Sequence, residues 1–201
     1  MVQIEKDGVI LRDMTENDIE DYVRWFTVET GWSDTDAPWE PIDTDEQTER
    51  KAWQEYYAAV KDLPDTVLRR KFEIERNGRH VGWVSRYGID EHYEWTKDPT
   101  DRVAVGIDIC EPDIRGRGVG AAALSAFAEY LFENSAQTVY TQTWSGNVRM
   151  VRCAEKIGFT ECSRRIGVRT VNGKHYDALT LVLQRDAADR GGEHAQTDRR
   201  E

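Results

Sequence analysis

The segment that most constrains the fold is RVAVGIDICEPDIRGRGVGAAALSAFAEYLFEN, residues 102–134. Its first part, residues 103–110, alternates side chains in the way typical of a β-strand. Its last part spaces apolar residues as on one face of an amphipathic helix. Between the two lies a loop with glycine at every second position, at Gly116, Gly118 and Gly120. A strand that turns through such a loop into a helix predicts a fold built from both kinds of element.

The rest of the chain continues this mixture of periods. In the first third, Thr15 and Thr44 each stand where a capping residue would begin a helix. Hairpins are predicted around Asn77-Gly78 and Asn172-Gly173, because Asn-Gly is a preferred dipeptide for two-residue turns. The helix in NVRMVRCAEKIGF would end at Gly158, a residue that readily adopts the left-handed conformation. The order β-α-α-β-β-β-α-β-α-β-β predicts an α/β fold of the mixed α+β kind, with helices flanking a mixed sheet.

Length and composition indicate one globular domain. With 201 residues, of which 39% are hydrophobic, the chain can bury a substantial core. We expect this domain over residues 1–185 and a polar, flexible tail over residues 186–201, which are rich in Gly, Arg and Glu. No run of about 18 apolar residues and no signal-peptide pattern occur, so we expect a cytoplasmic protein without a membrane partner.

Charge and ligand spacing narrow the function classes. The net charge of −11 disfavours nucleic-acid binding, because phosphates repel an acidic surface, and it permits a cationic partner. The cysteines Cys110, Cys153 and Cys162 form no C-x-x-C pair, and the histidines are scattered. The sequence therefore predicts neither a disulfide framework nor a bound metal.

The glycine loop favours an anion-binding site. The N–H groups of a helix's first turn lack partners within the helix, and glycine lets an anion approach them closely. The G-x-G-x-G spacing is one residue short of the dinucleotide fingerprint, and no G-K-[ST] enters the helix as in a P-loop. Arg115 and Arg117 add positive charge to this loop of an acidic protein. We therefore expect a phosphate group here, outside the two common nucleotide motifs.

Two motifs carry a family resemblance. RGRGVGA, residues 115–121, resembles the acetyl-CoA-binding signature of the GNAT N-acetyltransferases: Arg or Gln, two residues, Gly, one residue, then Gly or Ala. NVRMVRCAEKIGF, residues 147–159, is similar to the second signature, in which an Asn opens a helix that ends in Lys-x-Gly-Phe. The motifs stand in the family's order, and the resemblance spans roughly residues 9–185. It implies a GNAT-like three-layer fold with a splayed sheet, and acetyl-CoA as co-substrate.

The resemblance also implies roles for residues around the loop. Backbone amides of residues 115–121 would hold the CoA pyrophosphate, and the two loop arginines could also meet phosphates. The strand end before the loop would pair with the pantetheine arm, and the helix-opening Asn would contact the cofactor beside its thiol. The cofactor-binding residues implied in this way are Ile109, Cys110, Arg115, Gly116, Arg117, Gly118, Val119, Gly120, Ala121 and Asn147.

Two familiar catalytic side chains of the family are replaced in this sequence. The tyrosine that many members use as acid is Ala154 here, and the serine of the ribosomal-protein branch is Met150. A thiolate is a good leaving group, so water could protonate it. An amine must lose a proton before it attacks, and a carboxylate is the natural acceptor. The candidate bases are Asp108 first, Glu73 and Glu75 second, and Glu161 third. GIDI also resembles the aminoglycoside 6′-N-acetyltransferase strand whose Asp contacts the acceptor amine.

The acceptor site is expected among the N-terminal helices and loops, where aromatic and acidic side chains gather. Aromatic faces together with carboxylates favour a cationic ligand, although about half of the rings or more should belong to the core. One such loop is GWSDTDAPWEP, and a second, DEHYEWTKDPT, would rim the same cleft. The predicted acceptor-binding residues are Trp32, Trp39, Glu75 and Tyr93.

The predicted activity is direct transfer of an acetyl group from acetyl-CoA to a primary amine, with a strand amide meeting the oxyanion. Transfer through Cys110 is disfavoured because no histidine lies near it in the sequence. We expect a small cationic acceptor, such as a polyamine or an aminoglycoside-like compound, and a monomer or homodimer. One alternative is a protein N-terminus, because the helix end AEKIGF also resembles the ribosomal-protein N-terminal acetyltransferases. Another is a CoA-binding protein with weak catalysis.

Overall fold

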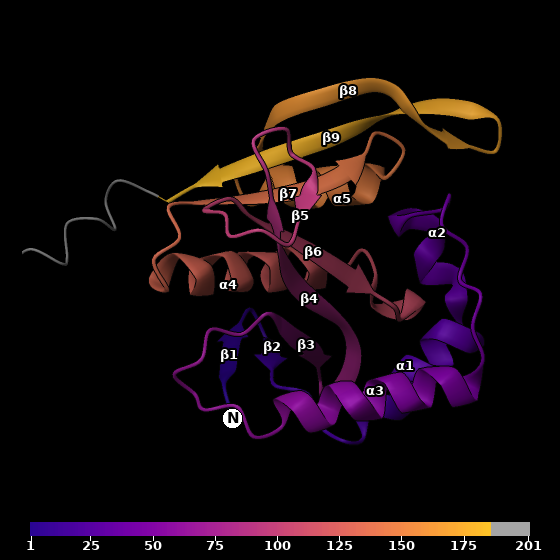
Figure 1. Ribbon diagram of the computed structural model, residues 1–201, viewed down its shortest axis with the longest axis vertical. Helices are drawn as coiled ribbons and strands as arrows, with labels where there is room; N and C mark the ends of the chain where they lie inside the picture. Colours follow the sequence, from indigo (N-terminus) through magenta and orange to yellow (C-terminus); the bar gives the residue numbers. More distant parts are fainter. Residues whose placement is uncertain (186–201) are drawn as a thin grey trace, which may run out of the picture.

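A computed structural model describes residues 1–185, so the tail expected over 186–201 lies outside the described residues (Figure 1). The strands are β1 (Gln3–Lys6), β2 (Val9–Arg12), β3 (Lys71–Arg76), β4 (Arg79–Ile89), β5 (Trp95–Thr96), β6 (Val103–Ile109), β7 (Thr138–Trp144), β8 (Thr160–Val171) and β9 (Lys174–Gln184). The helices are α1 (Asp18–Thr27), α2 (Ser33–Asp36), α3 (Glu46–Val60), α4 (Val119–Glu133) and α5 (Val148–Lys156), with 3-10 turns at Thr30–Trp32 and Pro112–Ile114. None of the helices in this part of the chain has the length and apolarity needed to cross a bilayer.

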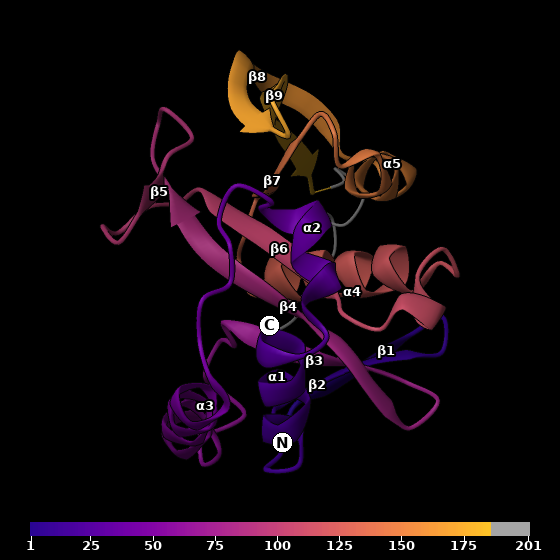
Figure 2. The same cartoon turned by 90° about the vertical axis from the view of Figure 1, so that its right-hand side faces the viewer.

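The strands form one mixed sheet in the order β1-β2-β3-β4-β6-β7-β9-β8, with β5 paired to β4 beside this path. All pairs are antiparallel except β6 with β7, whose parallel arrangement requires the crossover through α4. Helices cover both faces: α4 and α5 lie on one side, and α1 and α3 on the other (Figure 2). The predicted three-layer fold with a mixed sheet is therefore confirmed.

Each side of the sheet has its own core. Beneath α4, the apolar residues of β2, β3, β4 and β6 pack against Leu124, Phe127 and Leu131, which are buried at helical spacing. Beneath α1 and α3 the core is aromatic and includes Tyr22 and Trp25. The sheet thus separates a mainly aliphatic layer, which supports the glycine loop, from a mainly aromatic one.

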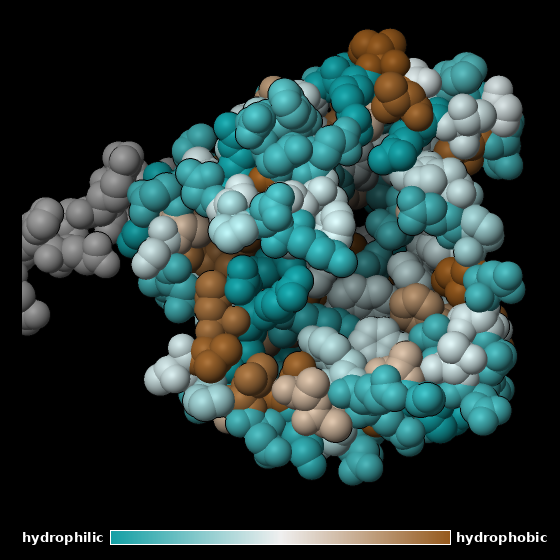
Figure 3. Space-filling model, viewed as in Figure 1, coloured by the Kyte–Doolittle hydropathy of each residue, from teal (hydrophilic) through white to brown (hydrophobic). Residues whose placement is uncertain are grey.

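The sheet splits at its parallel pair. β6 and β7 are paired only from Val103 with Val139 to Val105 with Thr141. Beyond that point β6 keeps only β4 as a neighbour, and β7 keeps only β9. One edge of the second half of β6 is therefore left without a strand partner. The molecular surface is hollowed between the β8–β9 half and the α1–α3 half (Figure 3).

The turn predictions are confirmed by the backbone. Asn77 and Gly78 have φ of 54° and 73°, and Asn172 and Gly173 have φ of 49° and 74°. Left-handed conformation at both central residues is the signature of the two-residue hairpin turn. Gly158 likewise follows α5 with φ of 97°.

Two helix starts and three small elements differ from the prediction. α1 begins after Asn17 because the N–H and hydroxyl groups of Thr15 bond to Asp18, which forms a turn before the helix. α3 is capped by Asp45, whose carboxylate accepts the N–H of Thr48 at 2.9 Å, and not by Thr44. The strand β1, the four-residue α2 and the two-residue β5 were not predicted. These elements are too short to show a clear period.

Candidate active site

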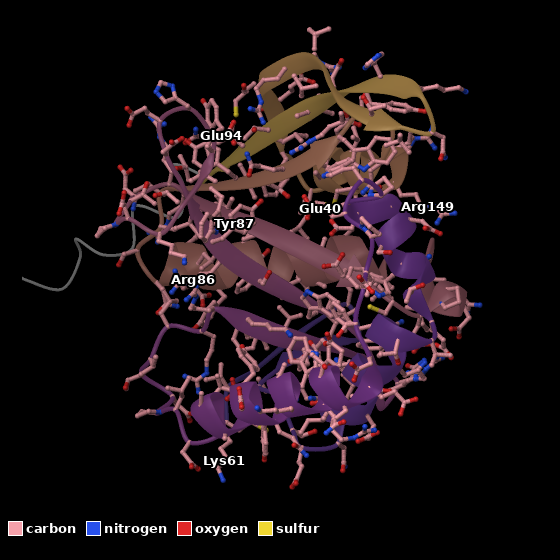
Figure 4. The ribbon with its side chains drawn as sticks, turned by 45° about the vertical axis from the view of Figure 1, so that its right-hand side comes forward. Glu40, Lys61, Arg86, Tyr87, Glu94 and Arg149 are labelled. Atoms are coloured by element: carbon pink, nitrogen blue, oxygen red, sulfur yellow. The ribbon has the colours of Figure 1, made fainter. Side chains whose placement is uncertain are left out.

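Two cavities open along the split in the sheet. The larger, of about 520 Å³, is bordered by β6, the glycine loop and α5. The smaller, of about 250 Å³, lies between β4, the segment around β5, β7 and the β8–β9 hairpin. Asp36, Gln142 and Thr143 line both. Figure 4 shows Tyr87 and Glu94 of the smaller cavity and Arg149 of the larger one. Ligands in the two cavities would therefore both contact Asp36, Gln142 and Thr143, which we call the shared wall.

The glycine loop presents free backbone donors to the larger cavity. Gly116 and Gly118 have φ of 76° and 84°, a conformation that side chains strain. A Cβ at either position would meet no atom within 4 Å, so the space beside the loop is open. Gly118 also precedes α4 without a side-chain cap, which leaves the first-turn N–H groups available. Loop and helix start therefore fit a pyrophosphate such as that of CoA.

The two loop arginines are placed differently, and only Arg115 lines the larger cavity. Arg115 turns back onto the strand, where its guanidinium donates to the carbonyls of Ile109 at 2.9 Å and Cys110 at 3.2 Å. It thereby holds the loop against β6. Arg117 is exposed and does not line the larger cavity.

Helix α5 adds further positive charge to the larger cavity. Arg149, Arg152 and Lys156 line the larger cavity, and their spacing of three and four residues puts them on one helix face. None of them has an ion-pair partner among residues 1–185. Sequence reasoning missed this basic face, although the spacing in NVRMVRCAEK carries its signal. The face is suited to the phosphates of a CoA molecule in the larger cavity.

Replacing Arg152 with Gln is expected to raise KM for acetyl-CoA by about tenfold, the effect of losing one charge-assisted contact to a phosphate. Because such a contact is the same in ground and transition states, kcat should change little. Steady-state kinetics at saturating acceptor measures both constants. Arg164→Gln is the matched control, since Arg164 lines neither cavity. An unchanged KM for acetyl-CoA would contradict the assignment of this face.

Asn147 supports the cofactor side by capping α5. Its Oδ1 accepts the N–H of Met150 at 3.1 Å, and the residue lines the larger cavity. Cys110 is buried, and burial together with the nearby Asp108 raises the pKa of its thiol far above the usual range. Such a thiol stays protonated and is a poor nucleophile. Of the residues implied as cofactor-binding, those that line the larger cavity are Ile109, Arg115, Gly116, Gly118, Gly120, Ala121 and Asn147; Cys110, Arg117 and Val119 do not.

Asp108 interacts electrostatically with Asp36, which lines both cavities. It stands on β6 opposite Trp83 of β4, on the α1–α3 side of the sheet, and lines the larger cavity. Burial raises its pKa well above the ordinary value, and the nearby Asp36 carboxylate adds to this, while Lys71 opposes it. The pKa of Asp36 is itself raised by desolvation and by the nearby Glu40 carboxylate. A carboxylate with a raised pKa beside a ligand cavity is suited to take a proton near neutral pH.

Close approach of the β4 backbone at Gly82 sets the position of Asp108 on β6. A Cβ at Gly82 would lie only 1.9 Å from the carbonyl oxygen of Asp108, so this position admits no side chain. The strands therefore approach closely here, which is the use expected of a glycine inside a strand. Sequence reasoning gave Gly82 no role.

The other candidate bases, Glu73, Glu75 and Glu161, line neither cavity. Glu73 is 1% exposed; it accepts a hydrogen bond from the Tyr22 hydroxyl and lies 3.0 Å from Nε2 of His80. Glu161 is exposed and pairs with Arg164 at 2.6 Å. Of the candidate bases, only Asp108 lines either of these two cavities.

The aromatic cluster of the N-terminal helices already holds a cation from the chain itself. Nζ of Lys71 lies 4.0 Å from the ring centre of Tyr22, 4.1 Å from Trp53, 5.1 Å from Trp83 and 5.4 Å from Tyr56. Burial lowers its pKa to about 8, although Glu73 at 3.8 Å favours the charged form. These rings thus form a core around Lys71 and leave the acceptor to other residues.

The predicted acceptor-binding residues do not lie together in the structure. Trp39 and Tyr93 line the smaller cavity, which makes it the candidate acceptor site. Trp32 lines the larger cavity, with its indole N–H bonded to the carbonyl of Trp25 at 2.9 Å. Glu75 pairs with Arg12 at 2.8 Å and lines neither cavity.

One group of side chains, two of them buried and one half-buried, has the composition of a metal site. Ligand atoms of Asp18, Asp21 and His80 lie within 4.8 Å of one another. The Arg12 guanidinium donates to both oxygens of Asp18, at 2.7 and 2.8 Å. Burial lowers the pKa of His80, but its hydrogen bonds to Asp21 and Glu73 outweigh this and raise it to about 9. The cluster is therefore a network of ion pairs that already contains two cationic side chains.

Comparison with known proteins agrees with this geometry. The acetyltransferase (GNAT) domain family matches residues 9–160. A GNAT-family acetyltransferase from Bacillus anthracis has 14% identity and a TM-score of 0.67, over 91% of this chain and 98% of that one. The ribosomal-protein-S5-alanine acetyltransferase from Vibrio fischeri has 17% identity and a TM-score of 0.70, over 93% and 98%. The putative acetyltransferase YncA from Salmonella typhimurium, solved with acetyl-CoA, has 20% identity and a TM-score of 0.64, over 96% and 99%. No curated protein matches the sequence. With a family match over more than half of its length, the chain belongs to the GNAT acetyltransferases.

Proposed function

We propose that this chain transfers an acetyl group from acetyl-CoA directly to a primary amine bound in the smaller cavity. The observation that carries the proposal is the wall of Asp36, Gln142 and Thr143 shared by the two cavities. It lets an amine in one cavity reach a thioester in the other without a covalent enzyme intermediate. Acetyl-CoA supplies the thioester, and the glycine loop and the basic face of α5 would hold it.

The residues around the shared wall supply the remaining chemistry. Asp108, directly or through water, takes the proton that the amine must lose before attack. The unpaired edge of β6 from Gly106 to Ile109 offers backbone N–H groups to the oxygen that becomes negative in the transition state. Gln142 is fixed in this wall, because its side-chain amide donates to the carbonyl of Tyr93 at 2.7 Å.

The size of the smaller cavity supports a small acceptor. Its volume of about 250 Å³ lies below the usual range for drug-sized ligands. A protein N-terminus is the second candidate, because RimL and the Vibrio fischeri enzyme are described as ribosomal-protein acetyltransferases.

The state of the cysteines supports a cytoplasmic location. Cys110, Cys153 and Cys162 are all free thiols, as is usual for proteins of a reducing compartment.

Release of CoA thiol in the presence of single amines and of short peptides tests this function. We expect at least one amine to raise thiol release well above acetyl-CoA hydrolysis, with the acetylated amine identified by mass spectrometry. Acetyl-CoA should also raise the melting temperature, whereas ATP and NAD should not. If acetyl-CoA binds but no amine or peptide accelerates thiol release, the chain is a CoA-binding protein and the proposal is wrong.

A further inference from the structure

The smaller cavity is bordered by charged side chains of both signs, Asp36 and Glu94 on one hand and Arg165 and Arg169 on the other. Arg165 and Glu94 form an ion pair with each other. Within residues 1–185, neither Asp36 nor Arg169 has an ion-pair partner. The cavity therefore presents one carboxylate and one guanidinium without ion-pair partners to a bound ligand.

Arg169 is held in position by aromatic packing. Its guanidinium carbon lies 4.4 Å from the ring centre of Trp39. Trp39 in turn packs edge-on against Trp144, with 5.9 Å between ring centres, and the Trp144 indole donates to the carbonyl of Thr35 at 3.0 Å. Stacking covers a face of a guanidinium and leaves its N–H edge free for a planar anion. Arg169 is thus preorganised to bind one.

A bulge in β8 brings two arginines to the same cavity. The pairing of β8 with β9 shifts register between Arg165 and Arg169, where Gly167 has φ of 66° and donates its N–H to Asp177 at 2.9 Å. Arg164, on the same strand, instead pairs with Asp177 at 2.7 Å and lines neither cavity. The strand thus has both a neutralised arginine and one that faces a ligand space.

The positions of the two unpaired charges, on Asp36 and Arg169, determine how a ligand would be oriented. Asp36 belongs to the wall shared with the larger cavity, where the thioester would arrive, whereas Arg169 lines the smaller cavity alone. Building on the proposed function, we infer that the acceptor is a small amine that also carries a carboxylate, like an amino acid. Its carboxylate binds Arg169 while its amine faces Asp36 and Asp108. A polyamine, by contrast, would place a like charge beside Arg169.

Pairs of amines that differ only in the carboxylate test this inference. Tyrosine against tyramine, histidine against histamine and lysine against cadaverine keep the amine and the side chain the same. We expect kcat/KM of the carboxylated member to exceed that of its partner by about tenfold or more in at least one pair, as for a charge-assisted contact. A preference for the decarboxylated member, or no preference in any pair, would overturn the inference. So would acetylation of peptide N-termini above all small amines.

Substitution of the arginine separates charge recognition from folding. Arg169→Gln should lower kcat/KM for the carboxylated acceptor by about tenfold and change that for its decarboxylated partner by less than about threefold. Arg169→Lys should restore part of the preference, and Arg164→Gln is the matched control on the same strand. An equal loss for both acceptors would contradict the role of Arg169. If thiol release responds to no amine at all, the proposed function fails; if it responds without carboxylate preference, only this inference fails.

Discussion

Replacing Asp108 with Asn is expected to lower kcat by about tenfold or more, while KM for acetyl-CoA stays within about twofold. The amide keeps the shape of the carboxyl group but cannot accept the proton of the attacking amine. Asp108 lines the larger cavity next to the shared wall and does not belong to the glycine loop or to α5, so cofactor binding should persist. Steady-state kinetics with both substrates varied measures the two constants.

The pH profile distinguishes proton transfer from a structural effect. Because the pKa of Asp108 is raised, the wild-type kcat should fall as pH decreases through a value above the ordinary carboxyl range, where the carboxylate becomes protonated. The Asn variant should lack this acidic limb. Asp34→Asn is the control, since Asp34 is exposed and lines neither cavity. A wild-type rate and profile in the Asp108 variant would remove this residue from the mechanism.

Replacing Glu73 with Gln is expected to destabilise the protein by about 3–5 kcal/mol, the usual effect of breaking a buried ion pair from one side. Glu73 is 1% exposed and lies between two buried cations, with 3.0 Å to Nε2 of His80 and 3.8 Å to Nζ of Lys71. Without its charge, both cations would remain buried with less compensation. For a domain of this size the melting temperature should fall by about 10 °C, which calorimetry can measure.

Glu161→Gln is the matched control for this prediction. Glu161 makes an exposed ion pair with Arg164, and pairs of this kind contribute about 0–1 kcal/mol. Its melting temperature should therefore stay within about 3 °C of the wild type. If the Glu73 and Glu161 variants melt together, the buried network does not stabilise the protein as described.

Local signals in the sequence predicted the fold and its turns well. The Asn-Gly turns, the C-terminal glycine of α5 and the loop at Gly116 and Gly118 depend on backbone conformations that few residues adopt, so the residue type itself is informative. Alternation and helical spacing then placed most of the long elements. The basic face of α5 is equally visible in the spacing of Arg149, Arg152 and Lys156, but the predicted phosphate contacts involved the loop arginines alone.

The acceptor side depends on contacts between distant segments, which one sequence does not reveal. Lys71 is separated in sequence from Tyr22 and Trp53, yet its ammonium lies among their rings. The composition of the N-terminal region therefore suggested an open cation site that the chain fills itself. Arg169 and Trp39 are far apart in the sequence and meet in a region where α2 also contacts β7, through the Trp144 indole and the carbonyl of Thr35.

The most direct test of the central claim is the initial-velocity pattern with acetyl-CoA varied at several fixed concentrations of the best acceptor. Direct transfer between two ligands that both contact the shared wall requires both cavities to be occupied at once. Double-reciprocal plots should therefore give intersecting lines. Parallel lines, together with an acetylated form of the enzyme detected by mass spectrometry in the absence of acceptor, would show transfer through a covalent intermediate and contradict the account.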